Sequence, residues 1–586
     1  MKRLIFVAAV AAALVVTAAA TADSDKKDGF KTAAPPMLIG VAPGSSTEAL
    51  ISTGDMVGGY RFESIPDGIA LQRHDNNRVQ AYVNHETSLV PFPFPMPPTP
   101  TTEANAQNDF ESAQVSLLTL NRATKGVIDG RLVVTSDQNY QRFCSSFLAT
   151  KAAGFEHPIL LTNEEGIDWV KRSGQPWPTT VGAADSRQIG AVVAVDHRTG
   201  RSNTIWGMGR HNHENSLAVP GYGHPVVLSG DDSFVNNPAQ SQVYSYIADS
   251  ANDVMNDRGE LYAFVSDVAG KDDYFDFAPG DPSSIHGHFE LVPKDIATGR
   301  RPDGTDLMAA DKGYPLPVSP APGMGWQRDA VTGIPIDGPQ WVLEHWGDEH
   351  TEDEPVFQFV RIEDMAYDKR PGMQNVVYLV DSGRGTAGAS QPGRSTNGRV
   401  WKMVLDKNDP KKVLSLSIFI EGDDQPVKTP TEIHQPDNIE STPQGLLVTE
   451  DPGSSQQFSP TEANATTARL MRYTFATNIL DIAAKVDQSL DENTGAPGIP
   501  SDKDANPAPG LLGAWESSGV IDASPYFGLG SFLVTVQAAT YWVDKATTTH
   551  DDLAPFGVPD YVHKRNGGQL VLLRLPGWGS TSTIDD

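Results

Sequence analysis

The sequence predicts an all-β protein, a six-bladed β-propeller with a long insertion between blades three and four. Six times along the chain an acidic or polar cluster opens a strand-like stretch, and a second cluster follows within about 20 residues. The first clusters are marked by Asp67, Cys144, Glu214, Glu363, Asp437 and Glu516. Four of the five intervals between these positions are close to 75 residues and the other is about twice as long. A fixed period of this kind is the signature of a repeat architecture.

Each repeat is predicted to contain four antiparallel strands. A turn-bounded strand such as 445–448 ends in the second cluster, and a β-hairpin follows after a variable connection. Two hairpins are clear, one joining 194–196 to 202–206 and the other joining 400–405 to 413–420. Their apolar residues alternate and are bounded by Asp, Asn, Gly and Pro. Four such strands repeated six times are most economically a β-propeller.

The two clusters of each repeat are expected on the same rim of the ring. In an antiparallel pair, the start of the first strand lies beside the end of the second. The second clusters close the second strands and contain Glu86, Glu165, Asp232, Arg384, Asp451 and Gln537. The sequence therefore predicts that twelve polar clusters surround the mouth of the propeller.

The predicted domain boundaries follow from composition. Residues 1–22 combine an early Lys-Arg pair, an apolar run and an Ala-Thr-Ala cleavage signal, as in a Sec-type signal peptide cleaved near Ala22. The protein is thus expected to be exported, either periplasmic or secreted. Residues 23–57 are predicted to be an N-terminal extension, 58–575 the propeller and 576–586 a C-terminal tail. The proline-rich and tryptophan-rich segment 268–356 is interpreted as an ordered lid or side insertion, which accounts for the doubled interval.

Charge and cysteine content exclude several classes of protein. The chain has 74 Asp and Glu against 45 Lys and Arg, a formal charge of −29, so nucleic acid is not an expected partner. Beyond the leader no apolar run approaches the length of a membrane-spanning helix, so no integral membrane segment is expected. The single cysteine, Cys144, rules out an intramolecular disulfide. The sequence does not specify an oligomeric state.

The many carboxylates of the clusters would lie close together at the mouth of the predicted propeller. If desolvated without a counter-charge they would repel one another strongly, and bound cations would remove that conflict. Oxygen ligands suit Ca²⁺ or Mg²⁺, and a flexible site with many oxygens favours Ca²⁺. The alternative is that these residues cap turns and strand ends. The candidate metal ligands are Glu164, Glu165, Glu214, Asp231, Asp232, Glu363, Asp437, Glu440 and Cys144. The nearby histidines His85, His211, His213 and His434 could add a transition metal.

Several motifs together resemble the PhoX-type alkaline phosphatase family. They are Leu161-Thr162-Asn163-Glu164-Glu165, Gly209-Arg210 leading to His213-Glu214, Gly230-Asp231-Asp232, Arg361-Ile362-Glu363 and Gln435-Pro436-Asp437-Asn438-Ile439. The resemblance runs from about Gly58 to Leu575. It implies a six-bladed propeller that binds calcium together with iron and hydrolyses phosphomonoesters. It also implies that Glu214, Glu363 and Asp437 are metal ligands, Glu164 a calcium-side acid and Arg361 a phosphate-binding arginine.

The chain departs from the family pattern in two places. The family carries an iron-ligating cysteine where this chain has Asn163, and Cys144 is either its replacement from another strand or an inert buried thiol. The leader also lacks the twin-arginine pair common in the family.

The resulting prediction is an exported metal-dependent phosphatase that acts on a small phosphorylated substrate. Its catalytic residues are expected to be Arg361, Glu363 and Glu214, and its cofactors Ca²⁺ with Fe³⁺ as a further candidate. The serines of the clusters, such as Ser145 and Ser518, are interpreted as turn-capping hydroxyls. Two alternatives stay open. One is a calcium-dependent phytase-like or lactonase-like propeller hydrolase, and the other is a non-enzymatic, metal-stabilised binding propeller.

Overall fold

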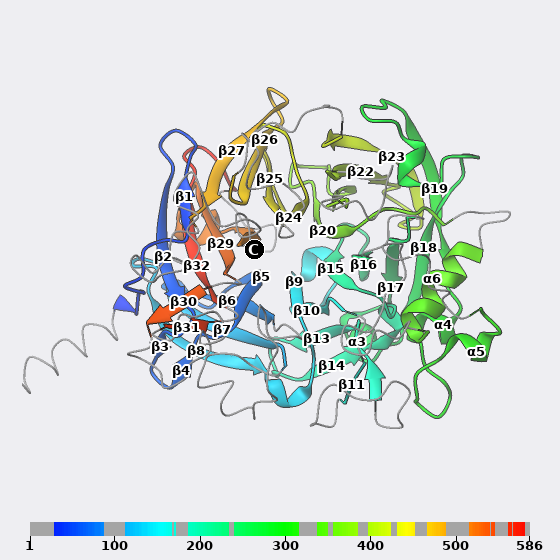
Figure 1. Ribbon diagram of the computed structural model, residues 1–586, viewed down its shortest axis with the longest axis horizontal. Helices are drawn as coiled ribbons and strands as arrows, with labels where there is room; N and C mark the ends of the chain where they lie inside the picture. Colours follow the sequence, from blue (N-terminus) through cyan, green and yellow to red (C-terminus); the bar gives the residue numbers. More distant parts are fainter. Residues whose placement is uncertain are drawn as a thin grey trace, which may run out of the picture.

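The protein is all-β, with many strands and a few short helices in a propeller-like arrangement (Figure 1), which confirms the all-β part of the predicted fold class. The computed structural model describes residues 28–86, 112–166, 169–171, 186–233, 239–315, 337–349, 356–384, 397–423, 431–451, 466–487, 515–538, 541–544, 561–564 and 567–580. The predicted signal peptide 1–22, the proline-rich stretch 91–108, residues 488–510, Trp326 and residues 581–586 lie outside these ranges.

Three antiparallel sheets have four strands each. Their strand orders are β5-β6-β7-β8, β14-β13-β10-β9 and β2-β32-β29-β28. Their bounds are β5 Ile65–Arg73, β6 Arg78–Glu86, β7 Gln114–Asn121, β8 Val127–Val134, β9 Phe143–Ala149, β10 Ile159–Glu164, β13 Val192–Asp196, β14 Ser202–Ile205, β2 Ser46–Ser52, β28 Glu516–Asp522, β29 Ser531–Ala538 and β32 Gly567–Arg574.

Two larger sheets complete the ring. In one, β1 joins the edge of the order β27-β26-β25-β24, and in the other β19 lies between β15-β16-β17-β18 and β23-β22-β21-β20. The bounds are β1 Leu38–Gly40, β24 Pro436–Thr442, β25 Gly445–Glu450, β26 Arg469–Thr474, β27 Ile479–Val486, β15 His213–Ala218, β16 Val226–Asp231, β17 Val243–Ile247, β18 Glu260–Ser266, β19 Ser284–Leu291, β20 Ile362–Tyr367, β21 Val376–Asp381, β22 Arg399–Leu405 and β23 Lys412–Glu421.

Short elements decorate the sheets. They are the strand pairs β3 Met56–Val57 with β4 Tyr60–Arg61, β11 Trp169–Lys171 with β12 Ser186–Gln188 and β30 Tyr541–Asp544 with β31 Tyr561–Lys564, the α-helices α3 Ala251–Met255, α4 Lys294–Thr298, α5 Ala309–Lys312, α6 Pro339–Glu349 and α7 Ser524–Phe527, and the 3₁₀ turns η1 Ser136–Gln138, η2 Lys151–Ala153, η3 Trp206–Met208 and η4 Tyr274–Asp276. No helix in the described ranges is long and apolar enough to cross a membrane.

The inner strands form a closed ring. In cyclic order β5 contacts β9, β9 contacts β15, β15 contacts β20, β20 contacts β24, β24 contacts β28, and β28 returns to β5. Viewed down the short axis, these strands surround the centre of the molecule and their sheets radiate outward (Figure 1). Because apolar clusters fill the space between each pair of neighbours, the inner strands are buried on both faces.

Segment 268–356 extends the outside of the ring. Its strand β19 pairs with both β18 and β23, and α6 packs Val342, Leu343 and Trp346 into an apolar cluster with the sheets beside it. Helices α4, α5 and α6 lie beside β18 at the periphery of Figure 1. The described parts of this segment therefore pack against the ring. Its role as a lid or side insertion stays a prediction.

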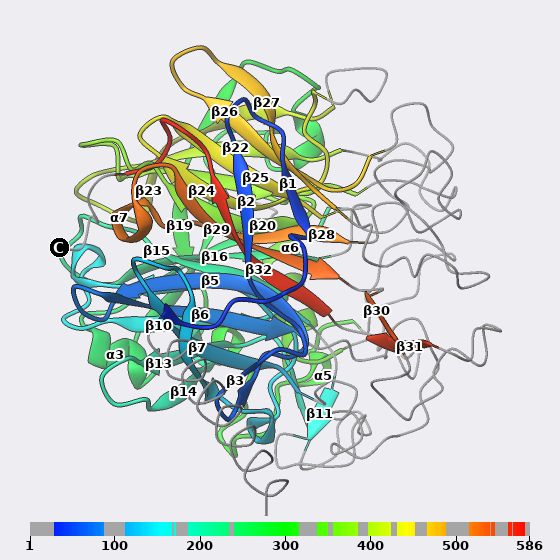
Figure 2. The same ribbon diagram turned by 90° about the vertical axis from the view of Figure 1, so that its left-hand side faces the viewer.

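The predicted N-terminal extension contributes strands to the sheets. β2 pairs along its length with β32, and β1 pairs with β27. A further bridge joins Phe30 to Val127 of β8. Figure 2, which views the molecule from this side, shows β1 and β2 running across the neighbouring sheets. The described part of the C-terminal tail is also packed, because Trp578 is buried in an apolar cluster.

Candidate active site

Each inner strand begins with a β-bulge next to the axis. In every case two residues of the inner strand stand opposite one residue of its partner. The bulged pairs are Asp67 and Gly68, Cys144 and Ser145, Glu214 and Asn215, Glu363 and Asp364, Asp437 and Asn438, and Ser518 and Gly519. A bulge re-aims side chains that a regular strand would direct into the sheet. The repeat seen in the sequence is therefore a repeat of bulges.

The strand pairing confirms that both clusters of a repeat share one rim. Ile65 pairs with Glu86, and Ile362 pairs with Asp381. The other four repeats pair Phe143 with Glu164, His213 with Asp231, Pro436 with Glu450 and Glu516 with Gln537. The start of each first strand thus lies beside the end of the second.

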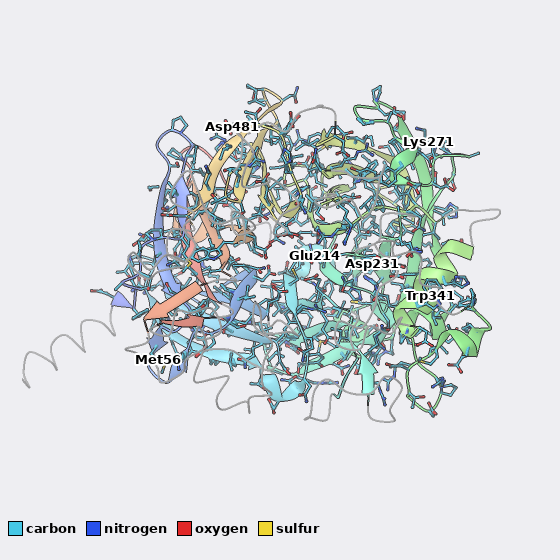
Figure 3. All side chains as sticks on the ribbon, viewed as in Figure 1. Met56, Glu214, Asp231, Lys271, Trp341 and Asp481 are labelled. Atoms are coloured by element: carbon cyan, nitrogen blue, oxygen red, sulfur yellow. The ribbon has the colours of Figure 1, made fainter. Side chains whose placement is uncertain are left out.

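Carboxylates from three inner strands converge at the axis. Glu214 of β15, Glu363 of β20 and Asp437 of β24 each offer an oxygen atom within 4.8 Å of the others. All three side chains are buried, and Figure 3 shows Glu214 near the centre of the ring. Burial, followed by the charge of Glu363, raises the pKa of Glu214 well above its ordinary value. Three buried carboxylates this close together repel one another when ionised, and a bound positive charge would remove that repulsion.

Glu214 also belongs to a second group of potential ligands. Its carboxylate, the thiol of Cys144 and the carboxylate of Glu165 offer atoms within the same 4.8 Å limit. The Cys144 Sγ lies 2.9 Å from Asp67 Oδ2 and 2.9 Å from Glu214 Oε1, so its single S–H proton has two carboxylate acceptors within reach. Burial and these acids raise the pKa of the Cys144 thiol. The thiol thus faces the axial acids.

Asn163, at the position where the resemblance implies a cysteine, is hydrogen-bonded within the protein. Its Nδ2 donates to the Ser145 carbonyl over 2.8 Å, and its Oδ1 accepts from the Ser216 hydroxyl over 2.6 Å. Both bonds tie β10 to the neighbouring inner strands. The amide is therefore committed to protein partners.

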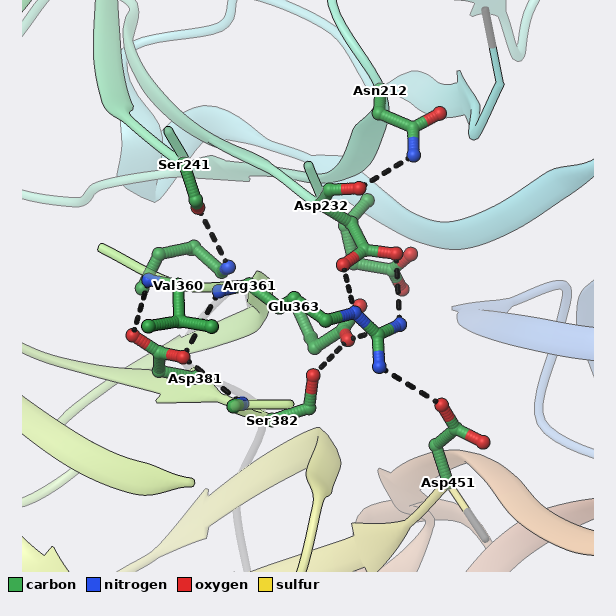
Figure 4. Close-up of polar contacts among 12 residues, drawn as sticks. Asn212, Asp232, Ser241, Val360, Arg361, Glu363, Asp381, Ser382 and Asp451 are labelled. Carbon is green, nitrogen blue, oxygen red and sulfur yellow. Dashed lines mark hydrogen bonds and ion pairs between the residues drawn. The ribbon is translucent and has the colours of Figure 1, made fainter. Parts of the chain in front are cut away.

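Arg361 is held rigidly beside these acids (Figure 4). Its Nε and Nη2 donate to the two oxygens of Asp232 over 2.7 and 2.9 Å. Nη2 also lies 2.9 Å from Glu363 Oε1, whereas Nη1 reaches Asp451 Oδ2 only at 3.4 Å. Although burial opposes the charged form, these carboxylates raise the pKa of Arg361. The bidentate bond fixes the plane of the guanidinium group.

The backbone before Arg361 is fixed by Asp381 at the end of β21. Its carboxylate accepts from the N–H groups of Val360 and Arg361 over 3.1 and 3.0 Å (Figure 4). Burial raises the pKa of Asp381 to about 6, although these donors oppose the rise.

Four further charged residues lie near Glu214, Glu363 and Asp437, which we call the axial group. The sequence did not predict these four as ligands or catalytic residues. Burial, followed by the charge of Asp67, raises the pKa of Glu86 to about 8. Glu516 is hydrogen-bonded to Asp451, and burial with that neighbour raises its pKa. The guanidinium groups of Arg142 and Arg384 also interact electrostatically with this acidic group. All of these residues belong to or adjoin the repeat clusters, which was the available signal.

Three of the predicted ligands lie in other environments. Glu164 accepts from the backbone N–H groups of Gln141 and Ala191 over 3.0 and 3.3 Å. Glu440 is ion-paired with Lys369. Asp231 accepts from the Asn212 N–H over 3.1 Å and lies 3.9 Å from His211 Nδ1.

The flanking histidines are buried in the sheets. His85 Nε2 is hydrogen-bonded to Ser116 Oγ over 2.6 Å, and His213 Nε2 to the Gly209 carbonyl over 3.1 Å. Burial lowers the pKa of His85 to about 4 and that of His213 to about 3. In the described ranges, the groups with metal-ligand spacing consist of Cys144, Glu165, Glu214, Glu363 and Asp437, without a histidine.

The architecture is thus that of an all-β, propeller-like protein with buried acids and an arginine at its axis. Comparison with known families identifies the group: the model of the alkaline phosphatase PhoX family matches residues 161–497. The chain belongs to this family, whose members are phosphatases.

The solved structures include one close in fold. Pseudomonas fluorescens PhoX, in complex with vanadate, a transition state analogue, matches 93% of this chain and 98% of its own with 15% identity and a TM-score of 0.53. A protein of unknown function from Dyadobacter fermentans matches 91% of this chain and 100% of its own with 9% identity and a TM-score of 0.36. A search of curated protein sequences gives no match.

Proposed function

We propose that the protein is an exported, metal-dependent phosphatase that hydrolyses phosphomonoesters at the mouth of a six-bladed propeller. The observation that carries the proposal is the convergence of Glu214, Glu363 and Asp437 beside the guanidinium group of Arg361. Family membership supports the reaction class. Vanadate bound to the Pseudomonas protein of similar fold agrees with a phosphoryl-transfer site.

The closed cycle of inner strands supports the count of six blades. Each member of the cycle starts with a bulge and leads a run of antiparallel strands. On this interpretation the nine-stranded sheet is two blades joined through β19, and segment 268–356 is inserted between blades three and four.

The donor atoms fit the expected metals. Glu214, Glu363 and Asp437 supply only oxygen, which suits Ca²⁺. Cys144 with Glu165 and Glu214 adds one sulfur ligand, which suits a transition metal such as iron better than Ca²⁺. Since carboxylates outnumber guanidinium groups around the axis, bound cations would also remove the repulsion that raises the pKa of Glu214. Cations held there would supply charge neutralisation for a phosphate and an acidified water molecule.

Arg361 would bind and orient the phosphate. A guanidinium group presents a planar fork of donors that matches phosphate oxygens. Nε and Nη2 contact Asp232 and Glu363, and Nη1 lies 3.4 Å from Asp451 Oδ2. Asp451 is the most exposed of these three carboxylates, with 20% of its side chain accessible. Because this side of the guanidinium group is the one nearest to solvent, we expect the phosphate to approach from the Asp451 side.

The leader supports export. Residues 1–22 have the composition of a Sec-type signal peptide, and the expected location is periplasmic or extracellular.

The test is hydrolysis of p-nitrophenyl phosphate by the purified mature protein, together with elemental analysis. We expect bound calcium, loss of activity after chelation and recovery when calcium is restored. The Arg361→Ala variant should lose activity while it keeps its fold. The matched control is Arg399→Ala, because Arg399 is also buried and paired, with Glu421 at 3.0 Å, but lies outside the axial group. Full metal occupancy without hydrolysis of any phosphate ester would refute the proposal.

A further inference from the structure

Six side chains, one of which is the axial acid Glu214, are linked by hydrogen bonds into a ring. Cys144 Sγ bonds Glu214 Oε1 over 2.9 Å, and Ser145 Oγ donates to the same oxygen over 3.0 Å. Asn438 Nδ2 donates to Ser145 Oγ over 2.7 Å, and Ser518 Oγ donates to Asn438 Oδ1 over 3.2 Å. Asp67 Oδ1 is a second acceptor for the single hydroxyl proton of Ser518, and Asp67 Oδ2 lies 2.9 Å from Cys144 Sγ. We call these residues, Asp67, Cys144, Ser145, Glu214, Asn438 and Ser518, the bulge ring.

The bulge ring joins strands that are distant in the sequence. All six residues occupy bulge positions, on β5, β9, β15, β24 and β28. Every one of these side chains is at least nine-tenths buried. Such polar groups would be costly to bury without partners, and each member of the ring has at least one partner within it. The two serines therefore belong to a network that joins several strands and are not separate turn caps. The sequence interpretation of Ser145 and Ser518 as turn-capping hydroxyls is therefore wrong.

The hydrogen-bond directions explain what the ring does. The amide of Asn438 donates to Ser145, so the single hydroxyl proton of Ser145 is directed to Glu214. Asn438 is itself fixed because its backbone N–H donates to Thr449 Oγ1 over 2.7 Å. The Asn438 amide on β24 thus fixes the position of one Glu214 oxygen on β15 through the Ser145 hydroxyl group.

We propose that Asn438 and Ser145 are positioning residues, which act together to hold the Glu214 carboxylate in the orientation that a cation at the axis requires. The expected effect on kcat rests on the proposed function. The expected effect on calcium affinity does not. Residues that orient ligands in this way contribute about 10-fold to 100-fold to metal affinity or activity. Because both residues act through one oxygen, their effects should not be additive.

The experiment compares Ser145→Ala, Asn438→Ala, the double variant and Ser145→Thr, which keeps the hydroxyl group. The control is Ser517→Ala, a buried serine of β28 whose hydroxyl donates to the Arg469 carbonyl over 3.0 Å outside the ring. Two readouts are used with the intact mature protein. One is the free calcium concentration that gives half of the maximal thermal stabilisation, and the other is kcat and KM for p-nitrophenyl phosphate.

We expect Ser145→Ala and Asn438→Ala each to raise the calcium concentration required about 10-fold to 100-fold and to lower kcat more than they change KM. The double variant should be no worse than about the poorer single variant, and Ser145→Thr should recover most of the loss. Ser517→Ala should lower the thermal midpoint alone. Multiplicative effects in the double variant, or a calcium requirement that is unchanged in both single variants, would overturn the inference. An inactive wild-type protein would refute the proposed function instead. The calcium titration would still test whether Ser145 and Asn438 position Glu214.

Discussion

Asp67 should make the metal-free protein less stable as the pH rises. Its carboxyl group has no exposed surface, and burial raises its pKa from 3.8 to about 6 despite hydrogen bonds from Cys144 and Ser518. The folded state thus holds the proton more tightly than the unfolded state. The stabilisation by protonated Asp67 is complete below pH 4 and is lost as the pH rises to about 6. At 1.36 kcal/mol per pKa unit, this loss is about 3 kcal/mol.

The assay is urea unfolding followed by tryptophan fluorescence between pH 4 and pH 7 in a calcium chelator. The Asp67→Asn variant should lack about 3 kcal/mol of the decline shown by the wild-type protein. Ser518→Ala should retain the decline and extend it to higher pH, because it removes a hydrogen bond that lowers the pKa of Asp67. Saturating calcium should reverse the trend, since a cation favours the ionised carboxylate. Identical pH profiles for the wild type and Asp67→Asn would refute this reasoning.

Three further outcomes are expected. Arg361→Lys should lower kcat/KM about 10-fold to 100-fold, because lysine keeps the charge but loses the fork of donors; unchanged kinetics would contradict the role given to Arg361. Cys144→Ser should retain calcium and lose transition metal by elemental analysis, and equal iron content in both proteins would remove Cys144 from the ligand set. Arg469→Met should destabilise the protein to urea by about 3 to 5 kcal/mol, because it leaves Glu450 buried without its partner, while kcat per folded molecule stays the same. A change in kcat without loss of stability would point to a role at the active site.

The all-β class and the propeller-like arrangement of sheets could be predicted because polar clusters mark the strand starts at a regular period. Strand starts such as Glu363 and Asp437 recur with a regular period, and antiparallel pairing then places them on one rim. The convergence of these acids with Glu214 and Arg361 could be expected for the same reason.

Side-chain direction could not be predicted, because it depends on the bulges. Glu164 and Glu165 are neighbours in one acidic motif, yet Glu165 lies beside Glu214 of the axial group whereas Glu164 serves the backbone of adjacent segments. The displaced register at the start of β9 similarly brings Cys144 to the axis and leaves Asn163 to link strands. A repeat period does not distinguish these outcomes, since a shift of one residue reverses the direction of a side chain.

The pairing of β2 with β32 has a consequence for the order of folding. Strand β2, residues 46–52, pairs with β32, residues 567–574, so the contact that completes this sheet spans more than 500 residues of sequence. Contacts of such high sequence separation form slowly during folding, and β2 stays unpaired until β32 has joined the sheet. A chain truncated before residue 567 would leave the edges of β2 and β29 open to other molecules. We expect such truncated chains to aggregate, because β32 covers both of these edges in the folded protein.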